Sequence, residues 1–193
     1  MRLVQKDLRL LLKNKHLSVQ SEFGGAVGGA QVRNAFGRSA DSDVGCVIES
    51  IETSQVEVEY LHGHLFSSTF HGASLLSLNK LLRLDHRTGE LKRYRAACHN
   101  AAERAVRLVE QRYKCKRMPM PEGLAVSLYR SGVKPFDNDA LVASNKFLID
   151  GFRCAGLIKE DDPSHIASFD KLVQRCGVGE PLSIGIAFCL SQQ

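Results

Sequence analysis

The strongest constraint on the fold is a strand-like run that leads into a helical run in the second half of the chain. Residues 124–129 read Leu-Ala-Val-Ser-Leu-Tyr, which is typical of a buried strand. From Asp139 to Cys154 the apolar residues recur with helical spacing, and Gly156 supplies an ordinary stop signal. The pattern predicts a sheet with a helix packed against it, and Asp137 and Asp139 lie at the junction.

The other patterns complete the same kind of domain. Residues 56–60 alternate between apolar and polar side chains, whereas residues 66–78 are rich in Ser and Thr and are expected to form a loop. We expect strands over residues 56–60, 124–130, 166–173 and 182–188, and helices over residues 91–113 and 139–154. This order predicts an α+β domain in which a small mixed β-sheet packs with helices.

The first part of the chain carries no recognisable functional motif. Residues 3–17 have the leucine spacing of an amphipathic helix with many Lys and Arg. Residues 23–37 are rich in glycine but lack the Gly-Lys-Ser/Thr of a phosphate-binding loop. We therefore expect residues 1–55 to be an N-terminal extension of unknown role and residues 56–193 to be the main domain.

Composition limits the classes of protein that need to be considered. The hydrophobic share of 44% suits a globular core, and the net charge of +5 is compatible with a polyanionic partner. The six cysteines include no Cys-x-x-Cys pair, which argues against a structural zinc site or a disulfide framework. No segment has the apolar length of a membrane span, and the first residues lack a signal-peptide core. We expect a cytoplasmic protein without a membrane partner.

The acidic residues after residue 130 suggest a metal site. In a strand, residues i and i+2 point to the same side, so Asp137 and Asp139 could converge on a hard cation such as Mg²⁺. On a helix, Asp139, Lys146 and Asp150 fall within one narrow sector. Carboxylates and a lysine in a basic protein favour metal-assisted phosphodiester chemistry.

The same residues also have simpler interpretations. An Asp at the start of a helix is usually a cap, and Asp-x-Asp pairs are common in turns. The pair Asp161-Asp162 stands directly before Pro163, as in many solvated loops. The basic residues of the predicted helix over residues 91–113 could equally form a solvated surface.

The order of these residues resembles the RusA family of Holliday junction resolvases from phages and bacteria. The matching parts are Asp137-x-Asp139, Lys146-x-x-x-Asp150, Ala155-Gly156, Asp161-Asp162 and, upstream, Ser77-Leu-Asn79-Lys80. The resemblance extends over about residues 56 to 190. The chain departs from the family pattern in two respects. Lys146 follows Asp139 by seven residues, whereas the family lysine follows by about one helical turn, and one residue more than expected stands between Gly156 and Asp161-Asp162.

The resemblance implies a RusA-like fold and a Mg²⁺-dependent endonuclease, with Mn²⁺ as a substitute, that resolves Holliday junctions or other branched DNA as a homodimer. It also implies a bacterial or phage-infected host cell. The catalytic residues it implies are Asp137, Asp139, Lys146 and Asp162, and its metal ligands are Asp137, Asp139, Asp162 and Asp161. Its DNA contacts would come from Asn79, Lys80, Lys92, Arg93, Arg95 and Lys134.

Three alternatives remain open at the level of sequence. The chain could be a catalytically weak or inactive DNA-binding phage protein of the same family type. An Asp-x-Asp pair also serves sugar-nucleotide transferases, although these need an upstream nucleotide-binding domain whose strand-and-helix alternation this chain lacks. The histidines His62, His64 and His71 could bind zinc or copper.

Overall fold

The computed structural model describes residues 44–61, 65–84, 89–114 and 119–191. The elements in these ranges are α2 (Val44–Thr53), β1 (Gln55–Leu61), β2 (Leu65–His71), α3 (Leu78–Leu81), α4 (Glu90–Tyr113), β3 (Leu124–Gly132), α5 (Asn138–Cys154), β4 (Ile166–Cys176) and β5 (Ser183–Leu190). The four predicted strands and two predicted helices are all present, with ends that differ by a few residues. The expected helix over residues 3–17 and the glycine-rich stretch over residues 23–37 lie outside the described residues.

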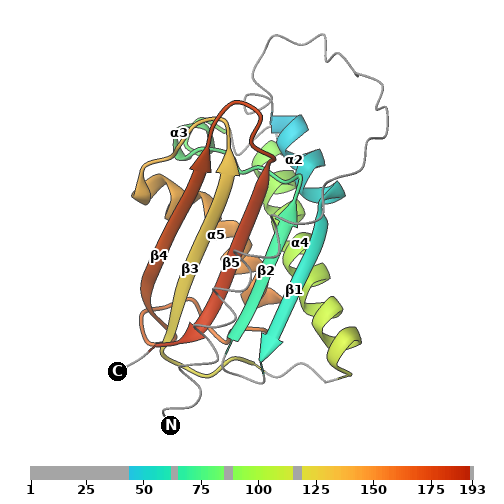
Figure 1. The fold of residues 1–193 in the computed structure, drawn as a ribbon, viewed down its shortest axis with the longest axis vertical. Helices are drawn as coiled ribbons and strands as arrows, with labels where there is room; N and C mark the ends of the chain where they lie inside the picture. Colours follow the sequence, from blue (N-terminus) through green and yellow to red (C-terminus); the bar gives the residue numbers. More distant parts are fainter. Residues whose placement is uncertain (1–43, 62–64, 85–88, 115–118, 192–193) are drawn as a thin grey trace, which may run out of the picture. The chain divides into compact units, whose positions relative to one another are not determined.

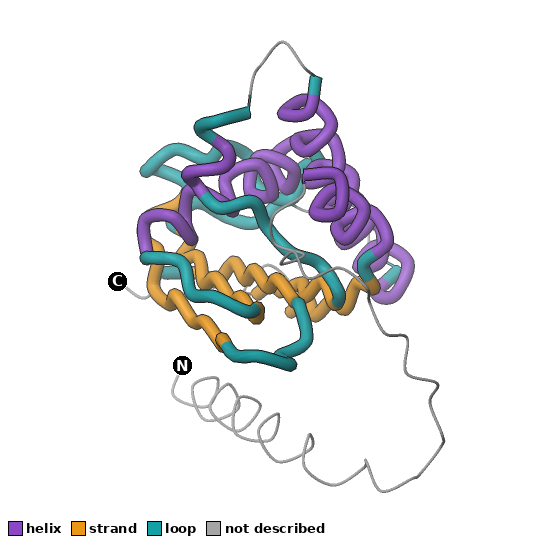
Figure 2. Tube along the Cα trace, turned by 90° about the horizontal axis from the view of Figure 1, so that it is seen from above, coloured by secondary structure: helices purple, strands orange, loops and turns teal. Residues whose placement is uncertain are grey.

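The strands form one mixed sheet in the order β1-β2-β5-β3-β4. Strands β3 and β4 are parallel, and the other neighbours are antiparallel. Because parallel neighbours need a crossover, α5 connects β3 to β4 across one face of the sheet. Figure 2 shows the described helices on one side of the strand layer, and Figure 1 shows α4 and α5 behind the sheet. The α+β class predicted from sequence is confirmed.

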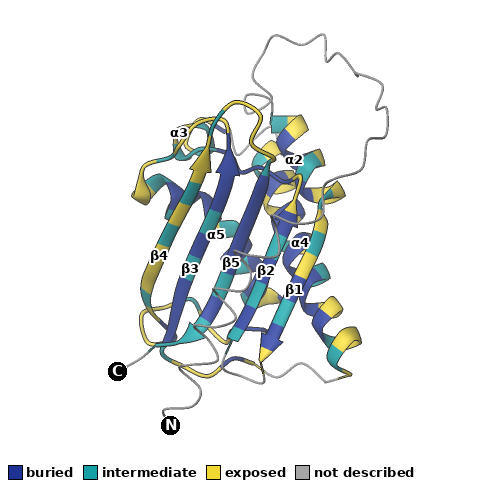
Figure 3. Ribbon diagram, viewed as in Figure 1, coloured by how far each residue is buried: buried dark blue, intermediate teal, exposed yellow. Residues whose placement is uncertain are grey.

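The core lies between the sheet and the helices. Aromatic rings from two strands and from α5 meet there: Phe152 lies 5.2 Å from Phe66 and 5.4 Å from Phe188 between ring centroids, both in edge-on arrangements. All three side chains are fully buried. Figure 3 shows the buried residues concentrated in the central strands β3 and β5, with exposed positions on the edge strand β4. Burial of this apolar surface is the main stabilising term for the domain.

Two corrections to the sequence interpretation concern the first half of the domain. The stretch 66–78 was expected to be a loop, but residues 65–71 form β2, which pairs with β1 on one side and with β5 on the other. The Ser and Thr residues do not prevent this, because Phe66 and Phe70 alternate toward the core and neighbouring strands satisfy the backbone. In addition, α2 lies within the predicted extension, yet its apolar side chains are buried in the shared core.

No helix in the described ranges has the length and the apolar character needed to cross a membrane.

The close contact between α4 and α5 generates a test of the packing. A Cβ atom at Gly151 would lie 2.9 Å from the Cα of His99 and 2.9 Å from the Cβ of Ala102. Gly151→Ala should therefore lower the free energy of unfolding by about 1–2 kcal/mol, because overpacking outweighs the gain in helix propensity. The melting temperature should fall by about 2–8 °C in a thermal scan. The control is Cys154→Ala at an exposed position of the same helix, which should be close to neutral. An unchanged or higher melting temperature for Gly151→Ala would show that α4 and α5 can move apart with no loss of stability.

Candidate functional site

The loop that precedes α5 is fastened to two strands. Arg130 of β3 is almost fully buried, its guanidinium lies 3.9 Å from the centroid of the Phe136 ring, and it donates a hydrogen bond to the carbonyl of Lys134 at 2.6 Å. From β4, the side chain of Gln174 accepts from the backbone N–H of Phe136 at 2.9 Å and donates to its carbonyl at 2.7 Å. These contacts fix the point at which α5 begins. Neither Arg130 nor Gln174 was predicted to contribute to a site.

Asp137 is the N-cap of α5. Its backbone is extended, with φ −69° and ψ 164°, and its Oδ1 accepts a hydrogen bond from the N–H of Ala140 at 2.7 Å. Asp139 is an exposed residue of the first helical turn. The interpretation that both aspartates end a strand and point to one side is therefore wrong, because β3 already ends at Gly132. A carboxylate that satisfies an otherwise unpaired N–H starts the helix instead.

The Ser77-Leu-Asn79 segment lies beside this helix start. A cavity of about 200 Å³ is lined by Ser77, Leu78 and Asn79 together with Pro135, Phe136, Asp137 and Ala140. The predicted Ser-x-Asn segment and the first predicted aspartate therefore come together from distant parts of the chain. Of the neighbouring basic residues predicted to contact DNA, Lys80 is half-buried on α3 and Lys134 is exposed.

Lys146 joins α5 to the loop that follows it. Its Nζ lies 3.0 Å from Oδ1 of Asp150 in an i,i+4 ion pair, and it also pairs with the carboxylate of Asp161. Partial burial acts to lower the pKa of Lys146, but the two carboxylates outweigh it and the pKa is raised. The hydrogen bond from Lys146 holds the pKa of Asp161 below its ordinary value. Lys146 and Asp161 are therefore both charged at neutral pH.

Asp162 makes different contacts from Asp161. Its Oδ1 accepts hydrogen bonds from the N–H and the hydroxyl of Ser164, at 2.9 and 2.6 Å, and from the N–H of His165 at 3.1 Å. The Nδ1 of His165 lies 2.9 Å from the same oxygen. Bonds from Ser164 and His165 hold the pKa of Asp162 well below its usual range. The residue organises the turn that leads into β4, and His165 is a contact that sequence reasoning missed.

The predicted metal ligands lie in two places: Asp137 and Asp139 at the start of α5, and Asp161 and Asp162 in the loop that follows it. Asp139 and Lys146 share one side of the helix but lie about 10.5 Å apart along its axis, since each residue adds 1.5 Å. Within the described part of the chain, no three His, Cys, Asp or Glu side chains are grouped closely enough to hold a metal ion. The oxygen donors suit a hard cation, but this arrangement does not assemble them into one site.

The basic helix α4 packs against α5 near Asp150. Lys92, Arg93 and Arg95 are exposed in its first half. Partial burial and the nearby charges of Arg95 and Arg153 lower the pKa of His99, while Asp150 opposes them. The charges of Arg95 and Asp150 both act on His99, so Arg95 is the predicted DNA contact on α4 that lies in the neighbourhood of Asp150.

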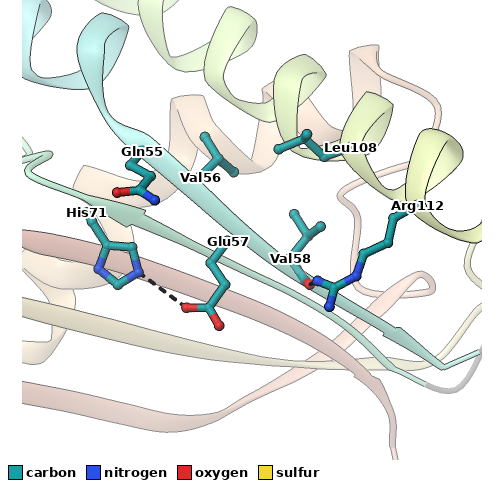
Figure 4. A pocket seen from close by; sticks show the side chains of 7 residues that line it. All are labelled: Gln55, Val56, Glu57, Val58, His71, Leu108 and Arg112. Atoms are coloured by element: carbon teal, nitrogen blue, oxygen red, sulfur yellow. Dashed lines mark hydrogen bonds and ion pairs between the residues drawn. The ribbon is translucent and has the colours of Figure 1, made fainter. Parts of the chain in front are cut away.

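A second cavity of about 260 Å³ lies at the β1 edge of the sheet and is lined by none of the residues predicted for the nuclease site (Figure 4). Arg112 of α4 donates to the carbonyl of Val58 at 3.1 Å, and His71 lies 3.3 Å from the carboxylate of Glu57. His71 thus has an acidic partner on the neighbouring strand. The other two histidines considered as metal ligands, His62 and His64, lie outside the described residues.

Comparison with known proteins adds no relative: no protein-family model, no curated protein and no solved structure matches this chain.

The ion pairs of Lys146 generate a prediction about stability and pH. Lys146→Met should lower the free energy of unfolding at pH 7 by about 1 kcal/mol, because two partly buried carboxylates lose their partner while solvent screens the exposed ammonium. A carboxyl whose folded pKa is lowered stabilises the protein above its ordinary pKa, 3.8 for Asp161, and this contribution is lost as the pH falls through the folded pKa. In urea unfolding, the difference in the free energy of unfolding between Lys146→Met and the wild type should therefore be largest near pH 7 and should become smaller below pH 3.8.

The matched control for this experiment is Lys159→Met. The Nζ of Lys159 lies 3.6 Å from Glu122, and both side chains are well exposed, so its loss should change stability less. Equal effects of the two substitutions at pH 7 would show that the contacts of Lys146 add nothing beyond an ordinary surface pair.

Proposed function

We propose that this chain is a Mg²⁺-dependent endonuclease that cuts Holliday junctions or other branched DNA, with Mn²⁺ as a possible substitute. The observation that supports it best is the meeting of the RusA-like segments around α5. Ser77, Asn79 and Asp137 line one cavity, and Lys146 pairs with both Asp150 and Asp161. Ser77 and Asn79 lie far from Asp137 in the sequence, and Asp161 lies outside the helix that carries Lys146, so these two contacts do not follow from residue order, unlike the i,i+4 pair of Lys146 and Asp150.

The resemblance and the geometry together suggest roles for the side chains. Asp137 and Asp139 are oxygen donors at the exposed start of α5, and a bound Mg²⁺ would stabilise negative charge on the phosphate. Asp161 pairs with Lys146, whereas one oxygen of Asp162 accepts the hydrogen bonds of the turn. In this arrangement Asp161 is therefore the better candidate of the two for a metal ligand. Lys146 holds the 155–165 loop against the helix and places positive charge between these carboxylates.

DNA contacts would come from the exposed basic residues of α4 and from the segments beside the cavity. Lys92, Arg93 and Arg95 can neutralise phosphates without reading bases, which suits an enzyme that selects the shape of DNA. Asn79, Lys80 and Lys134 lie next to the start of α5. A four-way junction has approximate two-fold symmetry, so we propose that a homodimer presents two such sites to it.

A second candidate function is binding of branched DNA without cutting it. The separation of the carboxylates along α5 favours this candidate, because no three described ligand side chains converge on a metal position. Asp137, Asp161 and Asp162 each have a protein partner that accounts for their position. A scaffold of this kind would bind junctions equally well with and without Mg²⁺.

Cleavage of a labelled four-way junction separates the two candidates. The wild-type chain should introduce paired nicks with Mg²⁺ and none in EDTA, and a linear duplex should stay intact. Asp139→Asn should reduce the rate by at least about 100-fold, the scale of losing one group that stabilises transition-state charge. Its matched control is Glu49→Gln on the exposed side of α2, which should cut like the wild type.

The two possible failures have different meanings. Cutting that persists in Asp139→Asn would exclude the proposed site even if the chain is a nuclease. Tight junction binding by the wild type, with no cutting in Mg²⁺ or Mn²⁺, would support the binding protein instead. The oligomeric state of the DNA-bound chain, measured by light scattering, tests the homodimer separately.

A further inference from the structure

The face of the sheet that carries no described helix has a regular arrangement of side chains at its β4 end (Figures 1 and 2). Strand register places three rows of residues side by side there: Lys171, Ser127 and Ala187; Val173, Tyr129 and Gly185; and Arg175, Ser131 and Ser183. Paired residues share a face, and their neighbours Leu128 and Ile186 point into the core. We call these nine residues the open-face patch.

Tyr129 is the one aromatic residue of the open-face patch. A Cβ atom at Gly185 would lie 3.1 Å from the Cβ and 3.4 Å from a ring carbon of Tyr129, so the ring leans over the glycine of β5. The side chain is half-buried, and its other patch neighbours on β3 and β5 are Ser and Ala. Ser127 and Ala187 are half-buried like the ring, whereas Ser131, Ser183 and Gly185 are buried, so a flat ligand would reach the ring from the side of Ser127 and Ala187.

Positive charge borders this ring. Lys171 and Arg175 are exposed on β4, about 13 Å apart along the strand, with Val173 between them at 46% exposure. The nearby carboxylate of Asp170 forms a hydrogen bond with the side chain of Ser168. At the far end of the same face, β1 carries Glu57 and Glu59, so the basic character belongs to the β4 side.

We propose that the open-face patch binds single-stranded DNA, with one base stacked on Tyr129 and the phosphates held by Lys171 and Arg175. Aromatic stacking with flanking positive charge is the usual physical basis for binding single strands with little sequence preference. The patch shares strand β4 with the candidate site, because Gln174 lies between Val173 and Arg175 and bonds Phe136, next to Asp137, from the other face of the sheet. The proposal shares only its ligand class with the proposed function, since this binding needs neither metal nor cleavage.

The test is fluorescence anisotropy of a labelled oligothymidylate with the full chain in EDTA. Tyr129→Ser should weaken binding by about 5-fold or more, the lower limit for loss of one stacked base, while Tyr129→Phe should bind like the wild type. Lys171→Ala combined with Arg175→Ala should reduce the slope of log affinity against log salt by about 1.4. The control Ser67→Ala on β2 of the same face should change nothing.

Thermal unfolding of each variant verifies that it is folded before binding is compared. Unchanged affinity in both Tyr129→Ser and the double variant would overturn the proposal, and so would weak binding by Tyr129→Phe with a normal melting temperature. Junction cleavage is scored separately. If the chain binds the oligonucleotide through Tyr129 but never cuts a junction, this inference stands and the nuclease proposal fails. If it cuts junctions but the Tyr129 variants bind the oligonucleotide like the wild type, the nuclease proposal stands and this inference fails.

Discussion

The placement of α5 is the constraint on which the rest of the structure depends. Its C-terminal half approaches α4 so closely that Gly151 has no room for a Cβ atom, and Phe152 fills the centre of the core between Phe66 and Phe188. Its first residue is fixed by the loop that Arg130 and Gln174 hold against β3 and β4. The predicted acidic residues lie on this helix, at its start, or in the loop that it anchors. Packing at one end of α5 therefore decides where the acidic residues at its other end lie.

The carboxylates of the candidate site also show how structural and functional roles compete. Asp137 caps a helix, Asp161 pairs with Lys146, and Asp162 organises a turn, and the contacts of Asp161 and Asp162 stabilise their ionised forms. An ionised carboxylate is what a hard cation needs, so these contacts are compatible with a metal site in chemical terms. Separation along the helix is unfavourable for a shared metal site, because Lys146 follows Asp139 by seven residues, nearly one helical turn more than in the RusA family pattern.

The two faces of the sheet have different surroundings. One face packs against the helices and holds the aromatic core, and it positions α5. The other carries Tyr129 among small side chains, with basic residues at the β4 edge and acidic residues at the β1 edge. Because β4 contributes Gln174 to the first face and Arg175 to the second, one strand links the loop before Asp137 with the proposed DNA-binding patch.

Local sequence determined those features that depend on spacing along the chain. The periodicities of residues 91–113 and 139–154 fixed the two long helices, and the i,i+4 spacing fixed the pair between Lys146 and Asp150. Tertiary structure decided what depends on partners distant in the chain. Strand β2 forms because β1 and β5 flank it, although its Ser and Thr residues indicated a loop. Likewise, the role of Gln174 and the pairing of Asp161 with Lys146 follow from contacts between separate elements, which no local pattern specifies.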